Sequence, residues 1–297
     1  MKFGEYFKPM LLTEVNKSFD DDEYLYELKF DGIRATIHVS PSTFIIYNRN
    51  GYDITYLYPE LKDIQKNVKD KCIFDGEIVS FENTYPSFSK LQQRSHTKDK
   101  SKIAAFAENE PVCFVVFDCL YKNKKLITLP LIERKKVLEK FKDSNYFIKV
   151  QYTLKEGNKL FKKVKKANLE GIVAKKINSE YEINTRTRNW LKIKNFKDEE
   201  FYVGGYIDTK AKTSLLLGEY RDNKFYFVGK VSITRTRDIY NKLARMKKKS
   251  KSPFYEYQEK NAKYVNPKLK CEVTYLERTK CNNLRQPVFK RSTKKEG

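Results

Sequence analysis

The hydrophobic pattern of the chain changes near residue 195, and this change constrains the fold more than any other feature. Before it, strand-like and helix-like stretches alternate. Beyond a short polar stretch at 195–200, short strand-like stretches dominate. A chain of 297 residues is long enough for two domains. We therefore predict a first domain at 1–197 and a second at 198–297, with a flexible joint near 195–200.

The first part of the chain carries both strand and helix signals. Two strand-like stretches, 24–30 and 33–39, flank Asp31-Gly32, a dipeptide typical of two-residue hairpin turns. Further strand patterns cover 43–49, 71–81, 112–121, 171–176 and 190–194. Helical spacing of apolar residues follows Pro59 and Pro130 and recurs at 158–168. These signals predict an α+β domain.

The second part of the chain reads mainly as β structure. Its strand patterns cover 201–207, 214–221, 224–231 and 269–279, and Asp222-Asn223 joins two of them as a turn. One helix is predicted at 236–246, followed by the Lys-rich run 247–252. Short strands with a single helix are typical of a small closed barrel such as an OB-fold.

The charge balance indicates the kind of partner. Lys and Arg number 61 against 38 Asp and Glu, a net charge of +23 that favours a polyanion such as nucleic acid over a merely Lys-rich surface. The five Cys form no CxxC pair and the two His lie far apart, which argues against disulfides, zinc and Ser-His-Asp chemistry. Without a membrane-length apolar run or a signal peptide, we expect a cytoplasmic protein with no membrane partner.

The hexapeptide KFDGIR at 29–34 is the first candidate for catalytic chemistry. If Asp31-Gly32 forms a two-residue turn, Lys29 lies opposite Arg34, and the two cations repel unless an anion lies between them. A triphosphate would supply that anion and bring Lys29 within reach of an α-phosphorus, while the neighbouring charge favours the neutral, nucleophilic amine. The hexapeptide alone also fits a solvated surface hairpin with two exposed basic ends, which is a common arrangement.

The order of the motifs that follow is more specific than any one of them. After the hexapeptide come NRNG at 48–51, FDGE at 74–77, FVVFD at 114–118, EGIV at 170–173 and WLKIK at 190–194. Over residues 25–195 the sequence resembles the covalent nucleotidyltransferase superfamily of DNA ligases, RNA ligases and capping enzymes. The NRNG, YPEL (58–61) and WLKIK motifs are similar to those of minimal ATP-dependent DNA ligases.

This resemblance implies a fold and a reaction. The fold is α+β: a nucleotidyltransferase (adenylation) domain of antiparallel sheets flanked by helices, followed by a small β-barrel OB-fold domain. The reaction is the ATP-dependent sealing of 3′-OH/5′-phosphate nicks in duplex DNA through lysyl-AMP and DNA-adenylate. Lys29 is then the AMP-accepting nucleophile, Arg34 and Arg49 hold the ribose and phosphates, and Glu77 binds ribose or shares Mg²⁺ (or Mn²⁺) with Glu170.

The remaining site residues follow from the same resemblance. Phe117 is expected to stack on adenine, and Lys175, Lys192 and Lys194 to neutralise the α-phosphate. Because strand residues alternate between faces, Lys192 and Lys194 should point the same way. Three further ATP-binding positions are expected at Glu27, at Arg186 (with Arg188 as the rival) and at Arg285 in the last motif, where Lys290 and Arg291 are weaker candidates.

The partners and the alternatives complete the prediction. We expect a monomer acting on nicked double-stranded DNA, with no separate N-terminal DNA-binding domain because only 28 residues precede Lys29. A loop within 235–252 could help to enclose the duplex. An RNA ligase or capping guanylyltransferase is the nearest alternative, and a non-catalytic basic DNA-binding protein is the alternative from another class. The sequence leaves the bacterial or phage pathway, and any protein partners, open.

Overall fold

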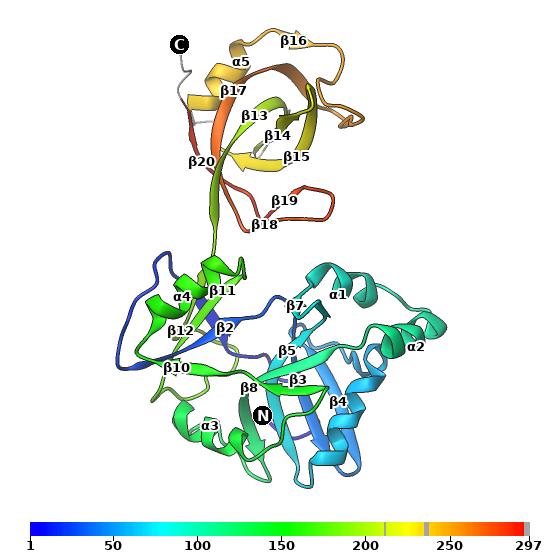
Figure 1. Ribbon diagram of the computed structural model, residues 1–297, viewed down its shortest axis with the longest axis vertical. Helices are drawn as coiled ribbons and strands as arrows, with labels where there is room; N and C mark the ends of the chain where they lie inside the picture. The colour runs from blue at the N-terminus through cyan, green and yellow to red at the C-terminus, as the bar shows by residue number, and fades with distance from the viewer. Residues whose placement is uncertain (211, 235–237, 294–297) are drawn as a thin grey trace. The chain divides into compact units, whose positions relative to one another are not determined.

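The computed structural model describes residues 1–210, 212–234 and 238–293. The chain forms two compact units, Met1–Asn195 and Phe196–Gly297, and each is described by itself (Figure 1). The boundary between them falls in the polar stretch where the hydrophobic pattern changes. Within the described ranges, every helix is too short or too polar to cross a membrane.

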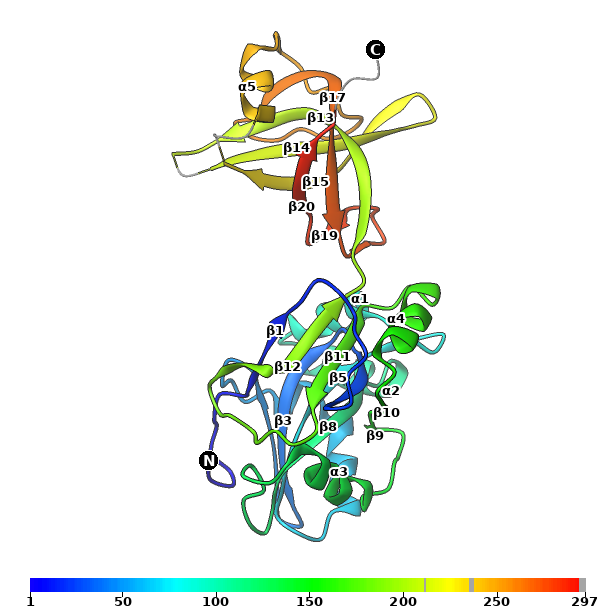
Figure 2. The same ribbon diagram turned by 90° about the vertical axis from the view of Figure 1, so that its left-hand side faces the viewer.

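One five-stranded sheet of the first unit contains the strand that ends in Lys29, and Figure 2 shows its strands β1, β12 and β11 side by side. Its order is β1-β12-β11-β2-β10. These strands span Leu11–Glu14, Arg186–Lys194, Gly171–Lys176, Tyr24–Lys29 and Tyr152–Leu154. Helix α4, Gly157–Lys166, packs its apolar side against β2 and β11 through Phe161 and Val164.

A second five-stranded sheet has the order β4-β3-β5-β8-β9. Its strands span Thr43–Asn48, Ile33–Ser40, Cys72–Val79, Cys113–Lys122 and Phe147–Lys149. We expected antiparallel sheets, but each sheet has one parallel edge pair, β1 with β12 and β8 with β9. The second arises because helix α3, Leu131–Glu139, returns the chain to the end of the sheet at which β8 began.

The segment between β5 and β8 forms helices that the hydrophobic pattern did not predict. It contains β6 (Phe81–Glu82), β7 (Tyr85–Pro86), α1 (Phe88–Ser95) and α2 (Lys100–Asn109). In α1, Arg94 is buried and binds both Glu60 and the carbonyl oxygen of Leu57. A polar residue at a core position removes the apolar periodicity on which a helix prediction depends. The stretch that begins at Pro59 is helical as predicted, as the 3₁₀ segment η2 (Pro59–Asn67), and a shorter 3₁₀ turn, η1 (Thr55–Leu57), precedes it.

The predicted hairpin around Asp31-Gly32 is wrong. β2 and β3 belong to different sheets, with Lys29 paired to Gly171 of β11 and Arg34 paired to Glu77 of β5. A Cβ atom on Gly32 would lie 2.2 Å from the carbonyl oxygen of Ile78. Asp31-Gly32 therefore carries the chain from one sheet to the other, and glycine is needed there for close approach to β5 rather than for a reverse turn.

The second unit is built on one six-stranded sheet with the order β15-β14-β13-β17-β16, and β20 pairs with β17. The elements are β13 (Lys197–Asp208), β14 (Thr213–Arg221), β15 (Lys224–Ile233), α5 (Asp238–Arg245), β16 (Lys248–Lys249), β17 (Lys263–Tyr275) and β20 (Val288–Ser292). A separate two-stranded sheet joins β18 (Glu277–Arg278) to β19 (Leu284–Arg285). The predicted turn at Asp222-Asn223 is confirmed, because both residues have the positive φ that such turns need.

The closed barrel expected for this unit is not reproduced by its hydrogen-bonded pairs. Among the described residues the pairings form an open path from β15 to β16. The apolar side chains of the curved sheet nevertheless meet in one core, which includes Phe201, Leu217, Val231 and Val273, and α5 contributes Ile239 and Leu243 to it. The predicted helix begins at 238 in the structure, and residues 235–237 lie outside the described residues.

Candidate active site

Lys29 lies at the end of β2, where its ammonium group meets a carboxylate. Its Nζ is 2.9 Å from Oε2 and 2.8 Å from Oε1 of Glu170, the residue immediately before β11. Gly171 allows this edge of β11 to lie close to β12, because a Cβ atom there would be 2.2 Å from the carbonyl oxygen of Ile193. The predicted nucleophile is therefore held by an acidic partner and does not face Arg34 across a hairpin.

Arg34 is fixed from two sides. Its Nε and Nη2 donate to the two carboxylate oxygens of Asp75, each at 2.6 Å, and its guanidinium lies 4.4 Å from the centre of the Phe117 ring. The hydroxyl of Tyr181 donates to the same Asp75 carboxylate at 2.6 Å. Asp75 belongs to the FDGE motif, so the sequence offered a signal for it. Tyr181 stands outside every motif.

Glu77 lies beside this pair in a half-buried position. Burial raises the pKa of Glu77 to about 7, with Lys29 and Arg34 acting against the rise and Glu170 adding to it. Desolvation penalises the charged form of a carboxyl group, so a cation placed near Glu77 would be favoured. Perturbed groups of this kind cluster at functional sites.

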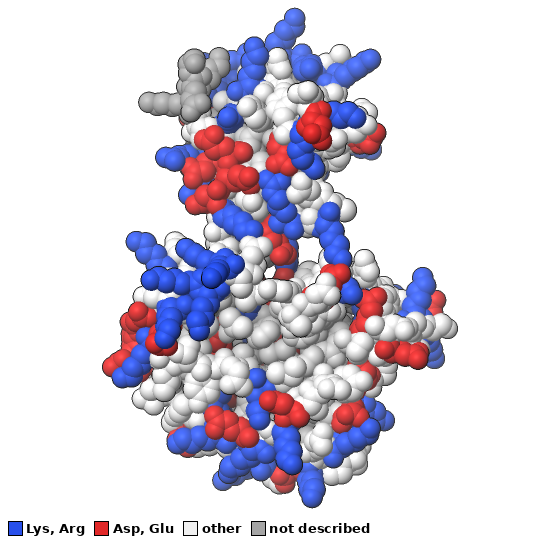
Figure 3. Space-filling model, in the orientation of Figure 1, with Lys and Arg blue, Asp and Glu red and all other residues white. Residues whose placement is uncertain are grey.

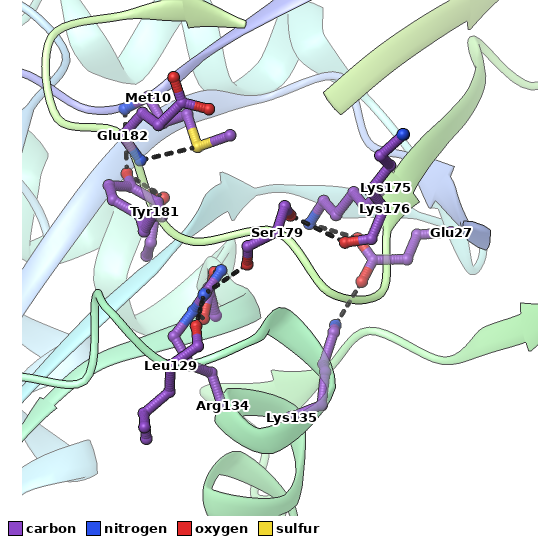
Figure 4. A network of polar contacts seen from close by, with 12 residues as sticks. Met10, Glu27, Leu129, Arg134, Lys135, Lys175, Lys176, Ser179, Tyr181 and Glu182 are labelled. Carbon is purple, nitrogen blue, oxygen red and sulfur yellow. Dashed lines mark hydrogen bonds and ion pairs between the residues drawn. The ribbon is translucent and has the colours of Figure 1, made fainter. Parts of the chain in front are cut away.

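A buried carboxylate between two ammonium groups forms the other end of the site. Glu27 Oε2 lies 2.6 Å from Nζ of Lys175, and Glu27 Oε1 binds Nζ of Lys135 on α3 (Figure 4). Burial lowers the pKa of Lys175 to about 8; Glu27 opposes the change and Lys135 adds to it. The same Lys175 Nζ lies 4.1 Å from the ring centres of Phe117 and Trp190.

The two lysines of the WLKIK motif share a counter-ion that the sequence did not identify. Nζ of Lys192 and of Lys194 lie 3.1 Å and 3.3 Å from the same oxygen of Glu14. Both side chains therefore point the same way, as the alternation of strand residues predicts. Glu14 reaches them because β1 runs parallel to β12, with Glu14 paired to Lys192.

Most of the predicted residues line one cleft made of two adjoining cavities, which share Leu12, Lys29, Arg34 and Glu77. The first cavity adds Glu27, Phe117, Lys175 and Trp190, of which Phe117 is the candidate for stacking on adenine. The second adds the other cationic candidates: Arg49, Arg186 and Lys192. Arg186 also binds the carbonyl oxygen of Leu12, which fixes it in this cleft.

The last-motif candidates lie in the second unit and have partners there. Arg285 of β19 binds Glu277 at 2.7 Å. Lys290 lies 2.8 Å from Asp198 and 3.0 Å from Glu272, which also accepts a hydrogen bond from Arg291. Their contact with the nucleotide stays a prediction.

The first unit holds a lysine–carboxylate pair in a cation-lined cleft on two packed sheets, and a small β unit follows it in the chain. This combination is that of a nucleotidyltransferase domain joined to an OB-fold domain. The model of the ATP dependent DNA ligase domain family matches residues 8–194, and that of the ATP dependent DNA ligase C terminal region matches residues 208–295. The chain belongs to the ATP-dependent DNA ligase family, whose enzymes form phosphodiester bonds.

Individual relatives agree with this assignment. The SPbeta prophage-derived DNA ligase-like protein LigB of Bacillus subtilis is 34% identical, covering 96% of this chain and 98% of the relative. The multifunctional non-homologous end joining protein LigD of Mycolicibacterium smegmatis is 30% identical, with 96% of this chain spanning 38% of it. A solved structure, mycobacterial DNA ligase D complexed with ATP and MES, is 25% identical with a TM-score of 0.60, covering 98% of this chain and 96% of that one.

Proposed function

We propose that this protein seals 3′-OH/5′-phosphate nicks in duplex DNA by a route in which Lys29 carries AMP. The observation that carries the proposal is the position of the Lys29 amine, 2.8 Å from a Glu170 oxygen in a cleft lined by Arg34, Arg49 and Arg186. Such a cleft suits a nucleoside triphosphate, because arginine binds phosphate oxygens through a fixed fork of donors. The structure of a 25% identical ligase in complex with ATP supports the choice of nucleotide.

The first step is the attack of Lys29 on the α-phosphorus of ATP. The amine must first lose its ammonium proton, and Glu170 offers an acceptor oxygen at hydrogen-bond distance. The Nζ lone pair then forms the N–P bond, while the bond from the α-phosphorus to the bridging oxygen breaks and pyrophosphate leaves with that electron pair. Lys192 and Lys194 lie on one face of β12 and neutralise charge on the phosphate as it develops.

The base and the ribose occupy the other cavity of the cleft. Phe117 stacks on adenine, and Glu27 meets the edge of the base at the buried end. Lys175, expected at the α-phosphate, is buried against Glu27, so we assign it to the base instead. Arg34, held by Asp75, and Glu77 bind the ribose or phosphate oxygens. Arg49 and Arg186 hold the triphosphate, and Arg285 of the last motif acts on the pyrophosphate.

Glu77 and Glu170 fit a divalent cation, Mg²⁺ or Mn²⁺, as two hard oxygen donors beside the phosphate cleft. Proteins bind Mg²⁺ at such sites through one or two carboxylates, together with substrate phosphates. When bound, the ion supplies positive charge to the phosphate oxygens. Among the described residues, groups of three or more acidic, His or Cys ligands do not occur, so the phosphates would complete the coordination.

Two further transfers complete the sealing of the nick. A 5′-phosphate oxygen of DNA attacks the adenylate, the N–P bond to Lys29 breaks, and DNA-adenylate forms. The 3′-hydroxyl then attacks the 5′-phosphorus, forming the phosphodiester bond and releasing AMP. We assign the first two steps to residues 1–197, as the adenylation domain, and the grip on the duplex to both domains of a monomer, with 198–297 as the OB-fold.

Mass spectrometry of the purified protein with ATP and Mg²⁺ tests the proposal. We expect the protein to carry one AMP on Lys29 and to lose it when nicked DNA is added. Lys29→Arg keeps the charge and the Glu170 contact but should accept no AMP and seal no nicks. A second assay offers the protein α-labelled ATP or α-labelled GTP and then a nicked DNA or RNA duplex. Labelling of the protein by GTP alone, or transfer of the nucleotide only to nicked RNA, would contradict a DNA ligase. Sealing by the Lys29→Arg protein would contradict the lysyl intermediate.

A further inference from the structure

Helix α4 presents an exposed row of lysines that the reaction described above does not use. Lys162, Lys163, Lys165 and Lys166 are exposed on its last two turns, and we call these four residues the α4 lysine patch. Within the described residues, Lys163, Lys165 and Lys166 have no acidic side chain within ion-pair distance. By contrast, Lys159 at the start of the helix pairs with Glu156 at 2.8 Å.

The packing of α4 fixes this patch outward. Phe161 and Val164 are buried against β2 and β11, so the helix is held in place and its four patch lysines stay exposed to solvent. Figure 3 shows the result as a gathering of Lys and Arg side chains where Figure 1 labels α4. Lysines three and four residues apart on a helix repel one another, and the patch contains three such pairs, 162–165, 162–166 and 163–166. An anionic partner would relieve this repulsion.

The patch also lies close to the reacting groups along the chain. Glu170 is four positions after Lys166, so their Cα atoms are at most about 14 Å apart. That distance corresponds to roughly four nucleotides along a DNA strand. Because Glu170 binds the Lys29 amine, a duplex whose 5′-phosphate reaches Lys29 would bring its neighbouring phosphates near α4.

We propose that the α4 lysine patch binds the phosphate backbone of the nicked duplex beside the nick. This inference rests on the proposed function, and it adds a docking surface on the catalytic unit. The contacts are with phosphates, so the patch contributes affinity without sequence preference. Its contribution should fall as salt rises, because each lysine that neutralises a phosphate releases a counter-ion.

A matched pair of triple variants in the full-length protein tests the proposal. The test variant is Lys163→Gln, Lys165→Gln and Lys166→Gln. The control variant is Lys98→Gln, Lys100→Gln and Lys102→Gln. These are three exposed lysines, Lys98 just before α2 and the other two in its first turn, and they also have no ion pair within the described residues. Glutamine has a helix propensity close to that of lysine, so both helices should persist.

Binding of a nicked DNA duplex is measured by fluorescence anisotropy over a series of NaCl concentrations. We expect the test variant to bind at least about ten-fold more weakly at low salt, with a slope of log K against log salt shallower by as much as about 2.7. The control variant should keep the wild-type slope. Equal slopes for the two variants would overturn the proposal, because total charge rather than the patch would then govern binding.

Self-adenylation separates a failure of this inference from a failure of the proposed function. AMP transfer to Lys29 needs no DNA, so the test variant should be adenylated at the wild-type rate. Wild-type protein that never carries AMP would contradict the proposed reaction and leave the binding slopes interpretable. A slowed adenylation of the test variant would place the patch in the nucleotide site and overturn its assignment to DNA.

Discussion

Glu27 is buried between Lys135 and Lys175, and the stability of this group depends on all three charges being present. The side chains of all three residues are almost fully buried. Desolvating charges is costly, and the cost is offset only while each charge keeps its partners. The lowered pKa of Lys175, about 8, reflects the same burial, since the charged form is the one that desolvation penalises. Lys135 lies behind the nucleotide cleft and holds Glu27 from the side of α3.

Replacing Lys135 by Met tests this arrangement at constant side-chain volume. Loss of one ammonium group leaves a buried carboxylate under-compensated, and we expect the free energy of unfolding to fall by about 2 kcal/mol or more. Urea unfolding followed by the fluorescence of Trp190, the one Trp in the sequence, measures the change. The control is Lys136→Met, an exposed neighbour paired with Glu133, which should change stability by less than about 0.5 kcal/mol. Equal effects for both variants would contradict the role of Lys135.

At the scale of strands and helices, the close approach of two segments explains a glycine that the sequence had suggested was a turn residue. Gly32 carries the chain from β2 in one sheet to β3 in the other. A Cβ atom there would meet the carbonyl oxygen of Ile78 at 2.2 Å and Cγ of Glu77 at 2.8 Å. The first of these contacts is with backbone, so the clash cannot be relieved by moving a flexible side chain.

Gly32→Ala should therefore destabilise the protein by about 3 kcal/mol, at the upper end of the range for overpacking. It should also slow self-adenylation, because Lys29 and Arg34 flank the crossing and Glu77 faces it. Urea unfolding and the rate of AMP incorporation measure the two effects. An unchanged unfolding midpoint would mean that the crossing can accommodate a methyl group and that its closeness is not required.

The elements also show which features of the site could be predicted from sequence. The common direction of Lys192 and Lys194 follows from strand alternation, a local rule. The pairing of β2 does not follow from such a rule: Asp31-Gly32 is a local signal for a hairpin, whereas tertiary packing selected β11 as the partner of Lys29. Local patterns give the direction of a side chain, and long-range pairing gives its neighbours.

Residues that stabilise the site from outside the motifs were missed for the same reason. Glu14 reaches Lys192 through a parallel strand pair, and Lys135 reaches Glu27 across 108 residues of sequence. Tyr181 contacts Asp75 across 106 residues. Nothing local marks these residues, since Glu, Lys and Tyr on amphipathic segments are usually solvent-facing or core residues. Only the ordered motifs carried enough information to bring the other site residues together.

At the scale of the whole molecule, the net charge of +23 sets the response to acid. As carboxylates become protonated, the positive charge grows and the compact state is weakened by self-repulsion. One buried histidine should add a specific contribution to this general effect. His38 is fully buried, its Nδ1 accepts a hydrogen bond from the Gly4 N–H at 3.0 Å, and within the described residues its Nε2 lacks a partner. The rings of Phe3, Phe7 and Tyr47 surround it.

Burial lowers the pKa of His38 to about 4, so the folded protein keeps this imidazole neutral well below the pH at which the unfolded chain protonates it. A depressed folded pKa contributes stability that is present above the unfolded value of about 6.5 and is lost as the pH falls towards 4. At pH 5 the loss should be about 2 kcal/mol. We expect His38→Gln to remove this part of the difference in unfolding free energy between pH 7.5 and pH 5, as measured by Trp190 fluorescence in urea. His96→Gln, at the other and exposed histidine, should keep the wild-type difference, and a His38→Gln protein as acid-sensitive as the wild type would show that carboxylate protonation alone destabilises the fold.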